Sequence, residues 1–293
     1  AMQGLQTVVR PGAKLLSRIK TYQLSQKDVC EAPDEEVILL RGTKPRGDKP
    51  APLLEYDDSS ETLALRTSLQ AINKHLAAAE IDCGLSSVNA KRRRLRRIFH
   101  NGDFHSGGRL YGGFWQEMSS LERLENITID DDSTVELDVG QMGILALYNI
   151  AGATPPKGDL YDLSSAGIPV AARDGIKKVM NAMVSASKPL TRLPKGARQA
   201  LPRRHSLQDV TAAINAVHPK LSGQWCQGLY GAVWRIESDA LVQVLTRLNQ
   251  LGITPLPIHD AIVVASKDKA QAKKVMLEVY KTALGVEPGI SEA

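Results

Sequence analysis

Apolar and polar positions alternate in short segments of this 293-residue chain and follow a helical spacing in longer ones. Residues 134–139 alternate strictly, which is typical of a strand with one packed and one open face. Val135, Leu137 and Val139 are expected to pack, and Asp138 is expected on the open face with Thr134 and Glu136. A second apolar segment, residues 256–264, is interrupted by His259 and Asp260. We therefore predict a hairpin with this polar pair at its turn.

Longer segments show the apolar spacing of amphipathic helices. Helices are expected over residues 59–81, 170–187, 236–251 and 266–283. Strands are expected over residues 36–41 and 97–104, the second of them entering a hairpin. Residues 188–206 are rich in Lys, Arg and Pro and are typical of a mobile basic loop. Strands and helices mixed in this way indicate an α+β fold.

Two of the expected strands each contribute one aspartate, Asp138 and Asp260. Carboxylates that converge from separate strands can hold two divalent cations about 3.5–4 Å apart. Mg²⁺ suits such a site because it keeps several waters and takes only one or two protein carboxylates, and Mn²⁺ could substitute for it. We therefore predict that Asp138 and Asp260 bind two metal ions and act in catalysis.

The helix expected over residues 170–187 carries a polar stripe with one residue at every fourth position: Arg173, Lys177, Asn181 and Ser185. This spacing separates the side chains by about one helical turn, which suits a row of phosphates. We expect Arg173 to bind the outer phosphate of a nucleotide and Lys177 to be the nearest general acid for pyrophosphate. The alternative interpretation is an ordinary surface helix with a solvated polar stripe.

Positive charge is concentrated in one short run. The chain has a net charge of +5, and residues 91–97 contain six cations in seven positions. This run favours nucleic-acid binding, although a solvated basic helix end is the alternative. The predicted contacts are Arg92, Arg93, Arg94, Arg96 and Arg97. Aromatic residues make up only 4% of the chain, too few for a broad base-stacking platform.

The remaining composition narrows the setting of the protein. Cys30, Cys83 and Cys226 lack the spacing of a zinc site or a disulfide framework and fit a reducing, cytoplasmic setting. No apolar run approaches the ~20 residues of a membrane span, so no membrane partner is expected. Trp225 and Trp234 are interpreted as packing residues rather than stacking platforms, and residues 130–132 as a solvated turn.

An ordered set of short motifs suggests a family. The chain contains Gly108-Arg109, Asp138-x-x-Gln141, Asp159-Leu-Tyr161, Arg173-x3-Lys177 and His259-Asp260. Over residues 97–280 this order resembles the polymerase core of family A DNA polymerases and of the related single-subunit, phage-type RNA polymerases. The resemblance implies a right-hand fold, in which an antiparallel palm sheet carries helical fingers and the thumb is reduced or absent.

The resemblance also implies a division of the chain and of its residues. Residues 1–96 would form an N-terminal or thumb-like region, 97–150 and 236–293 the palm, and 151–235 the fingers. The substrate site would contain Arg173, Lys177, Asn181, Gln141 and Gly143 beside the metal-binding Asp138 and Asp260. The nucleic acid would be contacted by Arg109 and by His259 at the primer terminus, with Glu237 and Gln243 toward the template.

The chain departs from the family at positions that select the sugar. The DNA polymerases carry glutamate five residues after the first aspartate, whereas the position here is Gly143, as in the RNA polymerases. Ser185 replaces a tyrosine common to both groups, and Ala261 replaces an acidic residue of the DNA enzymes. The filter against ribonucleotides is therefore expected to be open, and no exonuclease carboxylates are present for proofreading.

These observations predict a compact, template-directed DNA polymerase that extends a primer with deoxynucleotides and could also accept ribonucleotides. Three alternatives stay open at this point. The protein could be an RNA polymerase or primase-like enzyme, a template-independent terminal transferase, or a non-catalytic nucleic-acid-binding replication accessory. The last is disfavoured because a relic has no physical reason to keep Asp138, Asp260, Arg173 and Lys177 together.

Overall fold

We describe residues 12–24, 35–45 and 49–292 in a computed structural model, so Cys30 lies outside the described residues. The strands are β1 (Ile38–Arg41), β2 (Leu53–Leu54), β3 (Ile81–Cys83), β4 (Arg96–His100), β5 (Asp103–Tyr111), β6 (Ile127–Ile129), β7 (Asp132–Val139), β8 (Leu256–Ile258), β9 (Ala261–Ala265) and β10 (Ile290–Glu292). The α-helices are α1 (Ala13–Thr21), α2 (Ser60–Ala78), α3 (Ser120–Asn126), α4 (Met142–Ile150), α5 (Arg173–Ser185), α6 (Ala197–Ala200), α7 (Leu207–Val217), α8 (Tyr230–Gln250) and α9 (Lys269–Leu284).

The larger sheet is antiparallel and carries both aspartates. Its strands follow the order β3-β6-β7-β9-β8, and β10 pairs with the end of β7. Leu137 and Val139 are buried as expected, but Thr134 is buried too, with its hydroxyl donating to the Ile127 carbonyl. The expected open face of β7 is therefore covered at its start. The α+β class with an antiparallel sheet is confirmed.

The smaller sheet was not predicted as a unit. Its order is β2-β1-β4-β5, in which β1 runs parallel to β4 and the other neighbours are antiparallel. Because β1 pairs with β4, this sheet runs across the boundary expected at residue 96. The helix α2 packs its buried Leu69, Ile72 and Leu76 into the common core.

The longest helix, α8, connects two parts of the molecule. Its buried stripe of Leu241, Val244, Leu245 and Leu248 packs into the core, as its spacing predicted. Its first turns lie directly on β5, because a Cβ at Gly231 would come within 2.1 Å of Ser106 Oγ. A Cβ at Gly108 would likewise lie 2.9 Å from Ser238 Oγ. These glycines allow the close approach that sets the position of the neighbouring Arg109.

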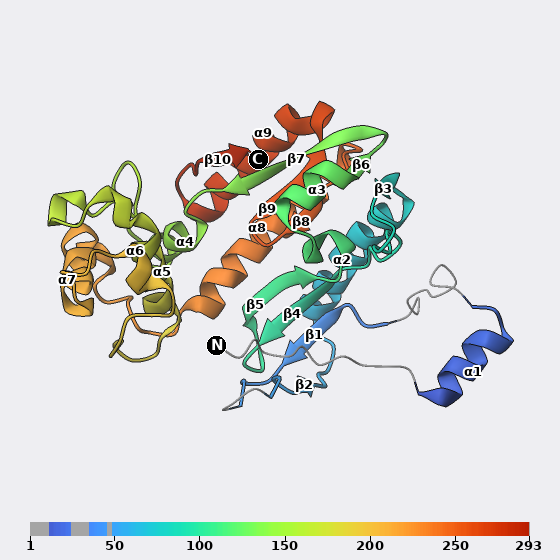
Figure 1. Cartoon of the computed structure of the whole chain (residues 1–293), viewed down its shortest axis with the longest axis horizontal. Coiled ribbons are helices and arrows are strands. Elements are labelled where there is room, and N and C mark those ends of the chain that lie inside the picture. The colour runs from blue at the N-terminus through green and yellow to red at the C-terminus, as the bar shows by residue number, and fades with distance from the viewer. Residues whose placement is uncertain (1–11, 25–34, 46–48, 293) are drawn as a thin grey trace.

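Residues 155–229 form a helical unit beside the sheets (Figure 1), built from α5, α6, α7 and short 3-10 turns. A buried histidine joins it to α4: the ring of His218 lies 2.7 Å from the Tyr148 hydroxyl and 2.9 Å from the Leu160 carbonyl oxygen. At the other end of the chain, α1 has no buried residue and lies apart from the rest (Figure 1). None of the described helices is both long and apolar enough to cross a membrane.

Candidate active site

The two aspartates meet at neighbouring positions of the larger sheet. Asp138 pairs with Ala261 in the register of β7 and β9, which puts Asp260 directly beside it. The predicted hairpin is present, with β8 and β9 antiparallel and His259-Asp260 between them. His259 adopts a positive φ of 56°, which this tight turn requires. Both carboxylates are half-buried and line one pocket of about 630 Å³.

The environment of this pair disfavours two negative charges. Burial, together with the nearby Asp260 and Glu136, raises the pKa of Asp138 to about 6. Burial also raises the pKa of Asp260, although Arg109, His259 and Lys177 partly compensate. Carboxylates held together at such a cost are a common feature of functional sites.

The donor set fits a cation that brings its own water and substrate ligands. No cluster of three or more Asp, Glu, His or Cys side chains with metal-binding geometry occurs in the described ranges. Asp138 and Asp260 offer two carboxylates. Mg²⁺ commonly binds one or two protein carboxylates and completes its coordination with waters and substrate phosphates. A cation between the two side chains would also remove their mutual repulsion.

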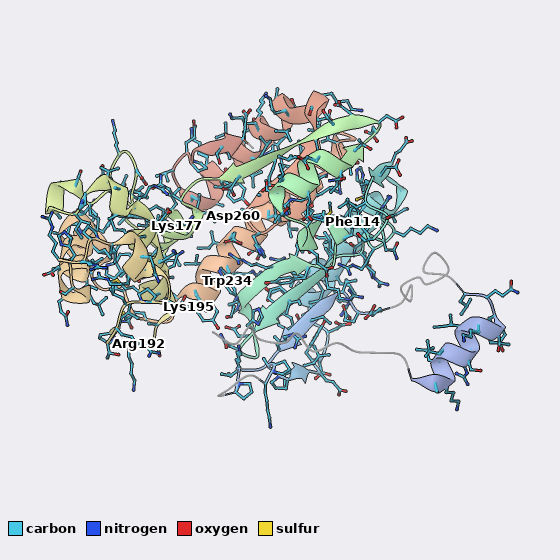
Figure 2. All side chains as sticks on the ribbon, in the orientation of Figure 1. Phe114, Lys177, Arg192, Lys195, Trp234 and Asp260 are labelled. Carbon is cyan, nitrogen blue, oxygen red and sulfur yellow. The ribbon has the colours of Figure 1, made fainter. Side chains whose placement is uncertain are left out.

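The helix α5 brings its polar stripe to the same pocket. The pocket is lined by Arg173, Lys177, Asn181 and Ser185 together with the two aspartates. Figure 2 shows Lys177 of this stripe near Asp260. Arg173 forms an ion pair with Asp159 at 2.5 Å, and its guanidinium lies 5.1 Å from the centre of the Tyr161 ring. Lys177 Nζ lies 5.9 Å from the same ring and forms no ion pair within the described chain. Tyr161 therefore lies next to both cations, and Asp159 pairs with one of them.

Residues 141 and 143 border the pocket at the start of α4. Gln141 accepts a hydrogen bond from the Leu160 backbone N–H at 2.6 Å, so it ties the end of β7 to residues 159–161. Its φ of 62° turns the chain from β7 into the helix. A Cβ at Gly143 would meet no atom within 4 Å, which leaves the pocket open at this position.

Arg109 reaches the pocket from β5 and is held on two sides. Its guanidinium lies 4.3 Å from the ring centre of Trp234 and forms an ion pair with Glu237 at 2.7 Å. Glu237 is only 2% exposed, and burial raises its pKa to about 7 despite the lowering effect of Arg109. The expectation that Glu237 faces the template is therefore wrong, because its carboxylate is buried against Arg109.

Glu237 and Trp234 are the pocket residues that sequence reasoning misjudged. Trp225 packs as expected at 6% exposure, whereas Trp234 lines the pocket as a platform for Arg109. The only sequence signal was their spacing of three on α8, which places both on one helical face. His259 precedes the pocket residue Asp260 but does not itself line the pocket; it is exposed, and its ring centre lies 6.2 Å from that of Tyr111.

The predicted nucleic-acid contacts in residues 91–97 need correction. Arg97 is 2% exposed, donates to the Gly108 carbonyl at 2.8 Å and pairs with Asp239. Arg93 donates to the Ala79 and Ile81 carbonyls at 2.7 and 2.6 Å, where it caps the end of α2.

The other arginines of this run also have protein partners. Arg92 forms an ion pair with Glu117 at 2.7 Å and Arg96 with Glu35 at 2.5 Å. Arg94 donates to the Glu35 carbonyl. The arginines of this run therefore connect β4 to the end of α2 and to the segment before β1, because their guanidinium groups bind carbonyl and carboxylate oxygens there. Its density in sequence did not translate into a free basic surface.

The pKa shifts predict how stability depends on pH. The folded-state pKa values of Asp138 and Glu237, about 6 and about 7, lie above their ordinary values. These two groups bind more protons in the folded protein than in the unfolded chain, so their contribution to the free energy of unfolding should fall as pH rises from about 5 to about 8. Burial lowers the pKa of His75, His100, His218 and His259, which contributes in the opposite direction. Thermal unfolding with and without Mg²⁺ across that range separates the two contributions. Added Mg²⁺ should raise Tm more at the upper end than at the lower, and an Mg²⁺ effect that is independent of pH would contradict the assignment.

Comparison with known proteins gives limited similarity. No protein-family model matches the sequence, and no curated protein matches it. Among solved structures, the fold is similar to the POL domain of Pol1 from M. smegmatis in complex with DNA primer-template and dNTP, with a TM-score of 0.44 and 10% sequence identity. The similar region covers 80% of this chain and 51% of that chain, so this chain spans about half the length of that protein.

Proposed function

We propose that this protein is a template-directed nucleotidyltransferase that extends a nucleic-acid primer, with a DNA polymerase as the specific form. The observation that carries the proposal is the meeting of Asp138 and Asp260 with Arg173 and Lys177 across one pocket of about 630 Å³. Paired carboxylates opposite a row of cations are the arrangement that metal-assisted phosphoryl transfer uses. The order of the motifs in the sequence supports the same conclusion.

In the proposed reaction the primer 3′-hydroxyl oxygen forms a bond to the α-phosphorus of the nucleotide. The bond from that phosphorus to the bridging oxygen breaks, and pyrophosphate leaves. The hydroxyl proton passes to solvent water, and Lys177 donates a proton to the pyrophosphate. Two Mg²⁺ ions, when bound by Asp138 and Asp260, would lower the pKa of the hydroxyl and neutralise the leaving group.

Other residues of the pocket position the reactants. Arg173 exchanges its ion pair with Asp159 for the outer phosphate, since a guanidinium binds phosphate and carboxylate with the same fork of donors. Asn181 and Gln141 border the nucleotide, and Arg109 contacts the primer–template from the opposite wall. His259 supports the primer terminus from the hairpin turn. The Arg109 side chain is kept in place by Glu237 and Trp234.

A primer-extension assay tests the proposed function. A labelled primer annealed to a template is incubated with Mg²⁺ and either deoxy- or ribonucleotides, and the same primer is tested without template. Template-dependent extension that EDTA abolishes is the expected result. Extension without template indicates the terminal transferase, exclusive use of ribonucleotides indicates the RNA-synthesising enzyme, and no extension under any condition contradicts the proposal.

Gly143 gives a specific prediction about the sugar. The Gly143→Glu side chain would project into open space at the start of α4, where a negative charge is favourable to a helix N-terminus. We expect it to block the space for a ribose 2′-hydroxyl and to lower the efficiency with ribonucleotides relative to deoxynucleotides by about tenfold or more. Ratios of kcat/KM for the two substrates measure this. Gly143→Ala is the matched control and should leave the ratio within about twofold.

A further inference from the structure

One segment of the helical unit carries a large excess of positive charge. Residues 175–208 contain eight Lys or Arg and no Asp or Glu. The rest of the chain has 29 Lys or Arg against 32 Asp or Glu, a net charge of −3. This segment therefore presents unbalanced positive charge next to α5, whereas Arg92, Arg96 and Arg97 of the denser run at residues 91–97 form ion pairs with carboxylates of the protein.

Six of these cations lie in residues 188–205, which we call the basic loop. They are Lys188, Arg192, Lys195, Arg198, Arg203 and Arg204, and all six are exposed. Within the ranges that the structure describes, none of the six forms an ion pair with a carboxylate. Arg198 donates only to carbonyl oxygens of its own loop, those of Arg203 at 3.2 Å and His205 at 2.6 Å. Their charge is therefore available to an external anion.

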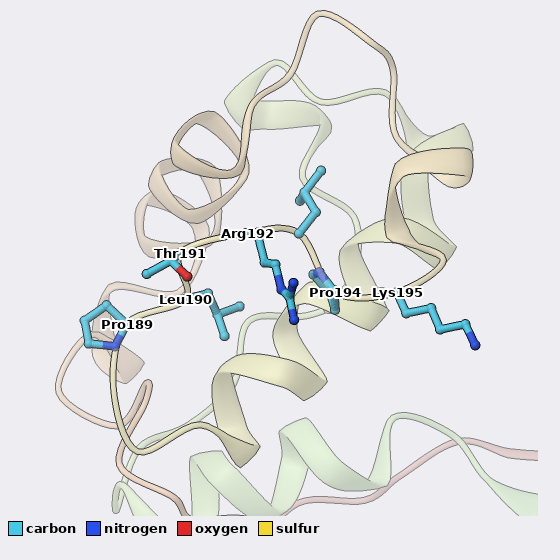
Figure 3. Close-up of a pocket in the computed structure, with 7 residues that line it drawn as sticks. Pro189, Leu190, Thr191, Arg192, Pro194 and Lys195 are labelled. Carbon is cyan, nitrogen blue, oxygen red and sulfur yellow. The ribbon is translucent and has the colours of Figure 1, made fainter. Parts of the chain in front are cut away.

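The basic loop is anchored to α5. Ala197 and Leu201 are buried, and a Cβ at Gly175 would come within 2.6 Å of the Leu201 side chain, so helix and loop are in close contact. Lys178 Nζ donates to the Gly196 carbonyl at 3.1 Å. The loop arches over a hollow of about 610 Å³, into which Arg192 extends while Lys195 points away (Figure 3). The cations are therefore presented from a backbone with defined contacts.

The distribution of these cations indicates the kind of ligand. They are spread over 18 residues, and Arg192 and Lys195 point in different directions (Figure 3), so one phosphate cannot engage them together, whereas a polyanion with regularly spaced charges can. Residues 175–208 contain no Phe, Tyr or Trp, so the surface lacks the large aromatic rings of a base-stacking platform. Such a surface binds the phosphate backbone without reading the bases.

We propose that the basic loop is a sequence-independent binding surface for the phosphate backbone of the nucleic acid. The proposal rests on the proposed function in that the ligand is the template or duplex on which the pocket acts. The loop begins three residues after Ser185, the last residue of the α5 stripe, so a strand bound there would lie next to the pocket. Figure 2 shows Arg192 and Lys195 of the loop on the same helical unit as Lys177. This surface would contribute the affinity for nucleic acid that the sequence pattern had suggested for residues 91–97.

Fluorescence anisotropy with a labelled primer–template tests this proposal, in EDTA and without nucleotides. The triple variant Arg192→Gln/Lys195→Gln/Arg203→Gln should weaken binding by about tenfold or more near 0.1 M salt. It should also reduce the slope of log K against log salt by up to about 2.7, since each lost phosphate contact accounts for about 0.9. Because all three side chains are exposed, Tm should be unchanged.

A matched control separates local contacts from overall charge. The control variant is Arg247→Gln/Lys267→Gln/Lys281→Gln, which also removes three exposed cations. Each of these cations lies outside the helical unit and forms an ion pair with a neighbouring carboxylate. The control should bind within about twofold of the wild type. Equal weakening in both variants, or none in the first, would overturn the proposal. The proposal would also be overturned if the triple variant kept its affinity for DNA but no longer bound anionic lipid vesicles that the wild type binds.

Failure of this inference can be told apart from failure of the proposed function. The binding assay contains neither metal nor nucleotide and reports only on the loop, whereas the extension assay reports on chemistry in the pocket. Wild-type extension with no contribution of the loop to affinity would refute the inference alone. Loop-dependent binding of DNA without extension would refute the proposed function alone.

Discussion

Primer extension is expected to fall by at least about 10³-fold in Asp138→Asn and in Asp260→Asn, because two metal ions supply several kcal/mol of charge stabilisation in such reactions. The two variants keep the shape of the side chains and remove one negative charge from a pair that burial and mutual repulsion disfavour. We therefore expect Tm of the metal-free variants at about pH 8 to equal or exceed that of the wild type. Loss of activity together with retained stability would separate chemistry from folding.

The matched control for these variants is Asp131→Asn. Asp131 is exposed in the turn before β7 and has a φ of 59°, a conformation that asparagine adopts readily. It should keep wild-type activity and the wild-type response of Tm to Mg²⁺. In contrast, Asp138→Asn and Asp260→Asn should lose that response. Activity within about tenfold of the wild type in both site variants would contradict the assignment of these aspartates.

A second large effect is expected at Lys177. Its Nζ is aimed into the pocket above Tyr161, and we assign it the proton that pyrophosphate receives. Lys177→Met should lower kcat by about 10² to 10⁴-fold, the usual contribution of a general acid. Lys177→Arg retains the charge but holds its proton too tightly to donate it. We expect this variant to recover KM for the nucleotide without recovering kcat, a split that steady-state kinetics measures.

The neighbouring Lys178 is the control on the same helix. It is exposed like Lys177, but its Nζ donates to the Gly196 carbonyl, away from the pocket. Lys178→Met should change kcat and KM by less than about threefold. If Lys178→Met and Lys177→Met lowered kcat equally, the role of Lys177 would be that of a general positive charge rather than of a positioned proton donor.

Much of the local structure could be predicted because its causes are local. Strict alternation over residues 134–139 marked β7, and a polar pair within an apolar segment marked the β8–β9 turn. The spacing of four along α5 placed Arg173, Lys177 and Asn181 on one face before any neighbour was known. Boundaries shifted by a few residues, since the first turns of α5 and α9 are preceded by 3-10 segments.

Contacts between distant segments were beyond such reasoning. The Arg109–Glu237 pair joins residues 128 positions apart, and nothing in either neighbourhood indicates the other. Thr134 is buried next to β6, which pairs with the start of β7 and accepts a hydrogen bond from the Thr134 hydroxyl at its Ile127 carbonyl. The six cations of residues 91–97 suggested a binding surface. The carbonyl and carboxylate partners of Arg93, Arg96 and Arg97, however, come from the end of α2, from β5 and α8, and from the segment before β1.

The sequence by itself determined which residues carry the proposed chemistry: Asp138 and Asp260 on strands, and Arg173 and Lys177 on one helical face. It could do so because strand and helix periodicity act over a few residues. Only the tertiary structure decided that these groups share one pocket and that Glu237 and Trp234 hold Arg109 there. It also decided that Arg92, Arg96 and Arg97 form ion pairs, whereas the exposed cations of residues 188–205 form none within the described residues. The physical reason is that charge pairing and burial depend on contacts between segments that are far apart in the chain, and local sequence patterns do not indicate those contacts.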